Sequence, residues 1–160
     1  MNLIRPTSCV LWLILIAVLA NGSATFPTSK FDDYGDVNCE DEWARLDNFA
    51  FGLSQYPAAT GYIIFYGGRR FRGRLPRRGE AAARAARIKP YLVERRGIAS
   101  DRIIVINGGY AESFHVELWI VPPGAVPPEP ISSVSEKEIR FARGRARKQM
   151  FQCNFMRKTK

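Results

Sequence analysis

The sequence has little histidine, little cysteine and, beyond its N-terminal part, no long apolar run. Its single histidine, His115, excludes a histidine-based metal cluster and leaves no convincing Ser-His-Asp triad. Its three cysteines are too few and too widely spaced for a zinc site. We therefore expect a protein that is not an enzyme and that carries neither a metal ion nor another cofactor.

The first 24 residues have the pattern of a secretory signal peptide. Arg5 supplies a positive charge, residues 9–20 are all apolar, and small residues follow at 21–24. As a helix, the apolar run would rise about 18 Å, which is short of the roughly 30 Å hydrocarbon core of a bilayer. We expect a cleaved signal over residues 1–24, with a retained membrane anchor as the alternative, and no transmembrane span in the mature chain.

Cys9 lies in the expected signal, so the mature chain keeps Cys39 and Cys153. After export these two cysteines would be in an oxidising compartment, in which they can pair. A disulfide between them would tie the tail to the start of the domain. Closing so long a loop stabilises a fold by roughly 4–5 kcal/mol on the chain-entropy model. We favour this disulfide, and the alternative is two unpaired thiols.

Charge is unevenly distributed in a chain whose formal net charge is +9. Acidic residues dominate 32–47, whereas basic residues dominate 69–96 and 137–160. Such asymmetry indicates interaction with polyanions, or a solvated face. Because an exported protein rarely meets nucleic acid, we expect no nucleic-acid partner, and anionic envelope polymers and lipid headgroups are better candidates.

The pattern of apolar residues predicts one α/β domain, followed by a Pro/Ser linker at 124–135 and a basic tail at 136–160. Helices between strands favour parallel pairing, and the short last connection favours a hairpin. Two helices can cover only one face of the sheet, so we expect an α+β two-layer sandwich of order β-α-β-α-β-β with a mixed sheet. The predicted strands are 31–37, 61–66, 102–106 and 114–121, and the predicted helices are 41–56 and 77–96, the second disturbed by Pro90 and capped by Gly97.

Several short motifs occur in a familiar order. Leu46-Asp47-x-x-Ala50-x-x-Leu53 precedes the strand GYIIFYGG, Arg84-Ala85 precedes Tyr91-Leu92, and Val116-Glu117-Leu118-Trp119-Ile120 closes the series. In order and spacing, residues 31–123 resemble the C-terminal, peptidoglycan-associating domain of OmpA-like proteins. The resemblance implies a non-enzymatic envelope protein in the periplasm or at the outer membrane, or a secreted one.

The OmpA-like family holds the diaminopimelate residue of peptidoglycan between an aspartate after the second strand and an arginine on the second helix. Arg84 falls at the position of that arginine, and Arg69 falls at the position of the aspartate. No acidic residue occurs from Gly61 to Gly79. The resemblance therefore implies a ligand role for Arg84, and the alternative is that Arg84 pairs with a structural acid such as Asp47.

Arginines crowd the loop and the helix start that precede Arg84. Guanidinium groups so close together repel one another, and a bound polyanion would relieve that repulsion. We expect peptidoglycan or another anionic envelope polymer as the partner. One alternative is an OmpA-like fold that has lost its ligand and binds a protein, and another is a hydrolase built on the acids at 32, 33, 36, 40 and 41. The candidate ligand-binding residues are Arg84, Arg69, Arg70, Arg72, Arg74, Arg77 and Arg78.

Overall fold

The computed structural model describes residues 27–151 and 153, so the expected signal peptide and residues 154–160 of the tail lie outside the described residues. Single turns of 3-10 helix lie at Ser100–Arg102, Glu136–Glu138 and Lys148–Phe151, and a π-helical turn lies at Tyr91–Arg95. The helices are α1 (Cys39–Gln55), α2 (Glu80–Ala85) and α3 (Ile88–Pro90), and the strands are β1 (Ser29–Tyr34), β2 (Thr60–Arg70), β3 (Arg77–Arg78), β4 (Ile103–Ser113), β5 (His115–Val121) and β6 (Ala142–Arg145).

Helix α1 begins at Cys39, slightly before the predicted start. Asn38 caps it, because the side-chain oxygen of Asn38 accepts a hydrogen bond of 2.8 Å from the backbone N–H of Asp41. The predicted apolar stripe is confirmed: Leu46 and Leu53 are almost fully buried. Burial of this stripe against the sheet fixes the orientation of α1.

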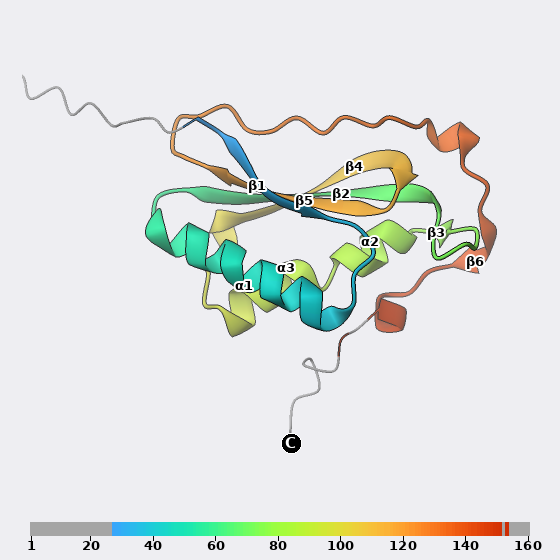
Figure 1. The fold of residues 1–160 in the computed structure, drawn as a ribbon, viewed down its shortest axis with the longest axis horizontal. Coiled ribbons are helices and arrows are strands. Elements are labelled where there is room, and N and C mark those ends of the chain that lie inside the picture. The colour runs from blue at the N-terminus through green and yellow to red at the C-terminus, as the bar shows by residue number, and fades with distance from the viewer. Residues whose placement is uncertain (1–26, 152, 154–160) are drawn as a thin grey trace, which may run out of the picture.

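Four strands form one mixed sheet in the order β1-β5-β2-β4 (Figure 1). Strands β2 and β4 are parallel, as the helical connection between them predicts, and β5 runs antiparallel to both β1 and β2. The helices lie on one face of this sheet, and the fully buried core side chains include Phe49, Ile63 and Leu118. The predicted mixed α/β class with a mixed four-stranded sheet is confirmed.

The predicted hairpin between the last two sheet strands is wrong. Only Phe114 separates β4 from β5, yet the two strands lie on opposite sides of β2. The chain therefore crosses the end of β2, and a Cβ atom on Gly68 would come within 2.4 Å of the Phe114 backbone nitrogen. Glycine at position 68 permits this crossing, which a rule based on connection length alone does not foresee.

The single helix predicted for 77–96 is divided. Arg77–Arg78 form strand β3, and the helical region begins only after Gly79, whose φ is 73°. Pro90 cannot donate a backbone hydrogen bond, and the helix widens into the π-helical turn immediately after it. Gly97, with φ of 69°, lies just beyond this turn, as the sequence predicts for a cap.

The segment at 122–135, predicted as a linker from residue 124, runs along the sheet face opposite the helices (Figure 1). The Ile131 N–H donates to the Tyr66 hydroxyl at 3.3 Å, and the Val134 N–H donates to the Tyr110 carbonyl at 3.0 Å. This face of the sheet, which we expected to be partly exposed to solvent, is thus partly covered by the chain itself. Ile64 and Tyr66 are buried beneath it, while Glu117 stays partly exposed.

Residues 136–151 and Cys153, here called the strap, return along the helix side of the domain. Strand β6 of the strap pairs in parallel with β3, in a second, two-stranded sheet that the sequence did not predict. The expected disulfide is confirmed: Cys39 and Cys153 are bonded, with their Cα atoms 6.0 Å apart. The strap is therefore held both by backbone pairing and by a covalent bond.

Candidate functional site

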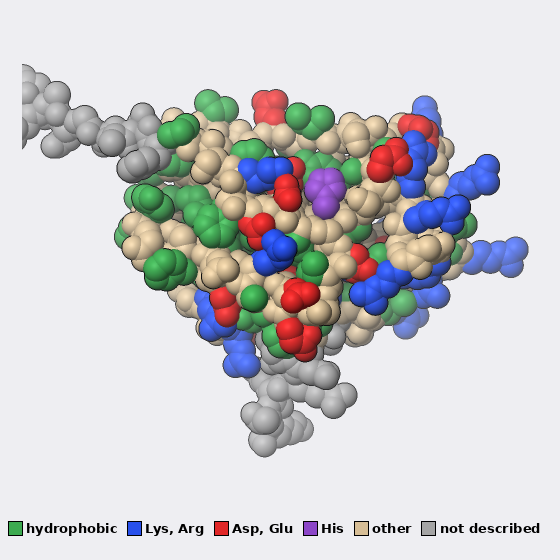
Figure 2. All heavy atoms as spheres, viewed as in Figure 1, with side chains coloured by type: hydrophobic (Ala, Val, Ile, Leu, Met, Phe, Trp, Pro, Cys, Tyr) green, Lys and Arg blue, Asp and Glu red, His purple; other side chains and the backbone are tan. Residues whose placement is uncertain are grey.

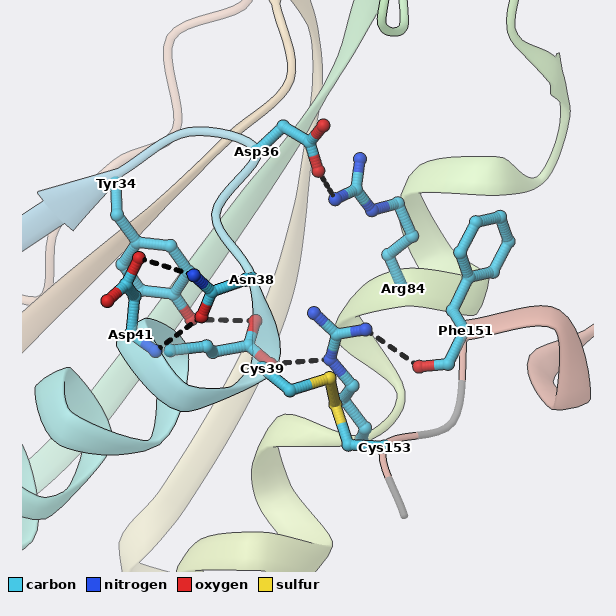
Figure 3. Close-up of a disulfide and its surroundings, with 10 residues drawn as sticks. Tyr34, Asp36, Asn38, Cys39, Asp41, Arg84, Phe151 and Cys153 are labelled. Carbon is cyan, nitrogen blue, oxygen red and sulfur yellow. Dashed lines mark hydrogen bonds and ion pairs between the residues drawn. A yellow bond between two sulfur atoms is a disulfide. The ribbon is translucent and has the colours of Figure 1, made fainter.

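Arg84 is the most deeply buried of the arginines that the sequence singles out. It lies on α2, and its side chain is 5% exposed. One side-chain nitrogen, Nη2, donates to the Asp36 carboxylate, and the guanidinium carbon lies 4.1 Å from the ring centroids of both Phe71 and Phe114. Figure 3 shows Arg84 pointing toward Asp36, with Phe151 of the strap beside it. The guanidinium is thus enclosed by an aromatic sandwich and one carboxylate.

Two donors of the same side chain are unused. Nε and Nη1 of Arg84 are buried and have no hydrogen-bond partner among the described residues. Burial lowers the pKa of the Arg84 guanidinium, and the hydrogen bond with Asp36 opposes that shift. A buried donor without an acceptor costs about 1–3 kcal/mol, so these two atoms mark a place where a water or a ligand oxygen would be stabilised.

The alternative stated for Arg84 is confirmed in part: Arg84 pairs with an acid of the same chain, but that acid is Asp36 and not Asp47. Asp47 accepts hydrogen bonds from Arg96 and from the Tyr91 hydroxyl, at 2.5 and 2.7 Å. Asp36 lies between β1 and α1, and its second oxygen accepts from Arg72 at 2.5 Å. No motif marks Asp36 in the sequence, because its approach to Arg84 depends on the packing of two segments that are 48 positions apart.

A pocket lies beside Arg84, at the carboxyl ends of the parallel strands β2 and β4. This end of parallel strands is where α/β folds commonly bind ligands. Its cavity volume is about 60 Å³. Because one water needs roughly 10–15 Å³ on this measure, the space suits a small group such as a carboxylate with its water. Residues that line this β2–β4 pocket include Arg70, Phe71, Arg77, Arg84, Asn107, Tyr110, Phe114 and Phe141.

Glu80 shapes one wall of the β2–β4 pocket. Its buried carboxylate accepts two hydrogen bonds from the Arg74 guanidinium, at 3.0 and 2.8 Å, and a third from the Arg77 backbone N–H at 2.9 Å. These bonds fix the loop that carries Arg70 and Arg77. Neither of those two guanidiniums forms an ion pair among the described residues: Arg70 donates to the Gly73 carbonyl, and Arg77 contacts the Met150 sulfur.

The seven candidate arginines therefore separate into two groups. Arg70, Arg77 and Arg84 line the β2–β4 pocket, and the other four lie outside its lining. Those four are paired with acids of the same chain, which neutralise the charge that the sequence leaves uncompensated. The pairs are Arg69 with Glu112 and Glu138, Arg72 with Asp36, Arg74 with Glu80, and Arg78 with Glu136.

A second buried ion pair lies close to Arg84. The Arg87 Nε donates to the Glu42 carboxylate at 2.5 Å, with side chains that are 11% and 4% exposed. Arg87 also donates to the Phe151 carbonyl of the strap at 2.7 Å, and the Tyr34 hydroxyl lies 3.3 Å from the other Glu42 oxygen. Burial and the Glu42 charge hold the pKa of Tyr34 well above its usual value. The sequence gives no signal for this pair.

Of the five acidic residues that suggested a hydrolase, three pair with residues of β1, of α1 or of the turn between them, and a fourth, Asp36, pairs with Arg72 and Arg84. Asp32 accepts from Arg45, Asp33 accepts from Lys30, and Asp41 accepts from the Asn38 side chain. None of these five acids lines the β2–β4 pocket. Over residues 27–151 and 153, no group of histidine, cysteine and acidic side chains is arranged to hold a metal ion. Within the same ranges, every helix is too short or too polar to cross a membrane.

No protein-family model matches the chain, and no curated protein matches its sequence. The resemblance to OmpA-like domains therefore stays a hypothesis, which depends on the order and spacing of the motifs. The candidate site depends on the structure alone, through the burial of Arg84 and the pocket beside it.

Proposed function

We propose that the protein is an exported, non-enzymatic binding protein of the cell envelope, and that its β2–β4 pocket takes an anionic group of peptidoglycan or of another envelope polymer. The observation that carries this proposal is Arg84, which lines that pocket and has two buried donors that lack a partner among the described residues. The proposed location is the periplasm, the outer membrane or the exterior. The disulfide between Cys39 and Cys153 suits an oxidising compartment.

The chemistry of the pocket favours a carboxylate or phosphate. Arg70 and Arg77 add two guanidiniums that form no ion pair among the described residues, and a guanidinium binds such anions through paired hydrogen bonds. Phe71 and Phe114 enclose the Arg84 guanidinium, and such low-dielectric surroundings strengthen charge-assisted hydrogen bonds. The hydrogen bond to Asp36 uses only Nη2 of Arg84, so Nε and Nη1 remain for a ligand.

The test is binding of the oxidised protein to purified peptidoglycan, with an R70A/R77A variant. We expect at least about a tenfold weaker association, because two charge-assisted hydrogen bonds are lost. A V126E/I131E variant is the matched control, because it lowers the net charge by the same two units at side chains that are 77% and 79% exposed on the opposite face. If both variants bind peptidoglycan as the wild type does, or if both lose binding equally, the β2–β4 pocket does not bind peptidoglycan.

Arg84 is tested by a conservative change, because alanine at a buried position would leave a cavity. In R84K the charge remains but the planar group with its unused donors is lost, so we expect weaker binding with an unchanged near-ultraviolet circular dichroism spectrum. Undiminished binding by R84K would remove Arg84 from the site.

A second function is favoured by one observation: five of the seven candidate arginines, Arg84 included, are already paired with acids of the same chain. Such internal neutralisation is what a fold that binds a protein instead of an anionic polymer would show. If the protein binds a protein partner instead, the correctly folded wild type should not bind peptidoglycan even at low salt.

A further inference from the structure

The outer side of the strap carries a basic surface that is separate from the β2–β4 pocket. Its side chains are all exposed, and none of them forms an ion pair among the described residues. None of them lines the β2–β4 pocket. This strap basic surface consists of Arg140, Arg143, Arg145, Arg147 and Lys148.

The acids of the strap do not neutralise this surface. Glu136 pairs with Arg78 at 3.2 Å, and Glu138 pairs with Arg69 at 2.7 Å, so both carboxylates of the strap are directed to the domain. Figure 2 shows lysine and arginine side chains projecting from the end of the molecule where β3 and β6 lie. The result is a local excess of positive charge on the strap, in addition to the high net charge of the chain.

The backbone that carries these cations is fixed. The Ala142 N–H donates to the Pro76 carbonyl at 2.9 Å, and the Ala146 N–H donates to the Arg78 carbonyl at 3.0 Å. Ala142 and Ala146 are partly buried, while Arg143 and Arg145 between them are exposed. Beyond β6, the disulfide anchors the strap a second time. The arginines are therefore displayed on an ordered ribbon, and little backbone entropy is lost when they bind.

We propose that the strap basic surface docks on a membrane that carries anionic phospholipid headgroups. The guanidiniums project from a protruding ribbon. This arrangement suits the headgroup layer of a membrane, in which many phosphates lie in one plane without fixed positions. An exposed apolar side chain, Met150 at 49%, lies two positions after Lys148. Basic residues with an adjacent apolar side chain are typical of segments that lie at a bilayer interface.

The test is sedimentation of the oxidised full chain with vesicles of phosphatidylcholine alone, or of phosphatidylcholine mixed with phosphatidylglycerol. We expect binding to the mixed vesicles only, and weaker binding as salt rises. Each basic residue near an anionic surface strengthens binding roughly fivefold, so R143A/R145A should bind about 30-fold more weakly. R143K/R145K should bind nearly as the wild type does, since a diffuse field of charge requires no fixed hydrogen-bond geometry.

The control is again V126E/I131E, which removes the same two units of net charge at the opposite face and should keep most of the binding. Three results would overturn the proposal: equal binding to both vesicle types, equal losses in R143A/R145A and V126E/I131E, or binding to soluble polyglutamate or DNA at salt concentrations that abolish vesicle binding. Neither Arg143 nor Arg145 lines the β2–β4 pocket, so weaker vesicle binding by R143A/R145A does not depend on that pocket.

Discussion

Replacing Arg87 by methionine should be among the most destabilising single changes in the domain. The substitution keeps most of the side-chain volume and removes the charge that faces Glu42, whose side chain is 4% exposed. Loss of one partner of a buried ion pair leaves an uncompensated charge in a poorly solvated place, which costs about 3–5 kcal/mol. The hydrogen bond to the Phe151 carbonyl is lost as well, so the strap should loosen in the same variant.

The size of the effect is best measured by a double-mutant cycle in urea, followed by tryptophan fluorescence of the oxidised protein. E42Q should cost less than R87M, because the glutamine oxygen can still accept from Arg87 and the glutamine amide N–H can donate to the Tyr34 hydroxyl oxygen. E42Q/R87M should be more stable than R87M alone, because no buried charge then lacks a partner.

The control is the exposed pair of Lys30 and Asp33, whose side chains are 41% and 55% exposed. K30M should cost no more than about 1 kcal/mol, as exposed pairs do. If R87M were as mild as K30M, or if adding E42Q to R87M destabilised the protein further, the argument from burial would be wrong.

Three further results are expected. C39S/C153S should unfold at lower urea, with a loss of up to about 5 kcal/mol, because the disulfide closes a loop spanning 114 positions. The hydrogen bond from Arg69 lowers the pKa of Glu138 from 4.5, so the Glu138–Arg69 pair helps hold the strap against the domain above that pH. This contribution is lost as pH falls through the lowered pKa. Hydrogen exchange in the strap should therefore rise on acidification in the wild type but not in R69A. G68A should destabilise the domain by several kcal/mol in thermal unfolding, because its Cβ would meet the backbone at the β4–β5 crossing.

Each of these results has a control in the same chain. G35A should be nearly neutral beside G68A, since the nearest atom to a Cβ there lies at an ordinary 3.4 Å. Reduced wild type should match C39S/C153S in urea. An acid-induced rise in exchange that persists in R69A would show that another group loosens the strap.

The sequence predicts those parts of the fold that depend on local periodicity. The stripe at Leu46, Ala50 and Leu53 places α1 against the sheet, and the alternation from Phe114 to Ile120 gives the buried face of β5 correctly. The separation of β2 and β4 by helical residues predicts their parallel pairing. In each case, the residues that decide the structure are close in sequence.

The features that the sequence missed depend on distant partners. Arg77 and Arg78 resemble a helix start by composition, yet β6 pairs with them from more than 60 positions away. The charge of the arginine loop looks uncompensated, because the acids that pair with it, such as Glu112 and Glu136, come from β4 and the strap. Composition counts charges, but only the tertiary structure shows which of them are already paired.

The disulfide has a consequence for how the molecule responds to proteolysis. Because Cys39 is joined to Cys153, the chain between them is a closed covalent ring. A protease that cleaves once within the ring, for example in the proline-rich stretch at 122–130, produces a nicked molecule in one piece. The two fragments separate only when the sulfur–sulfur bond is also broken, so a single scission would leave β6 attached to α1.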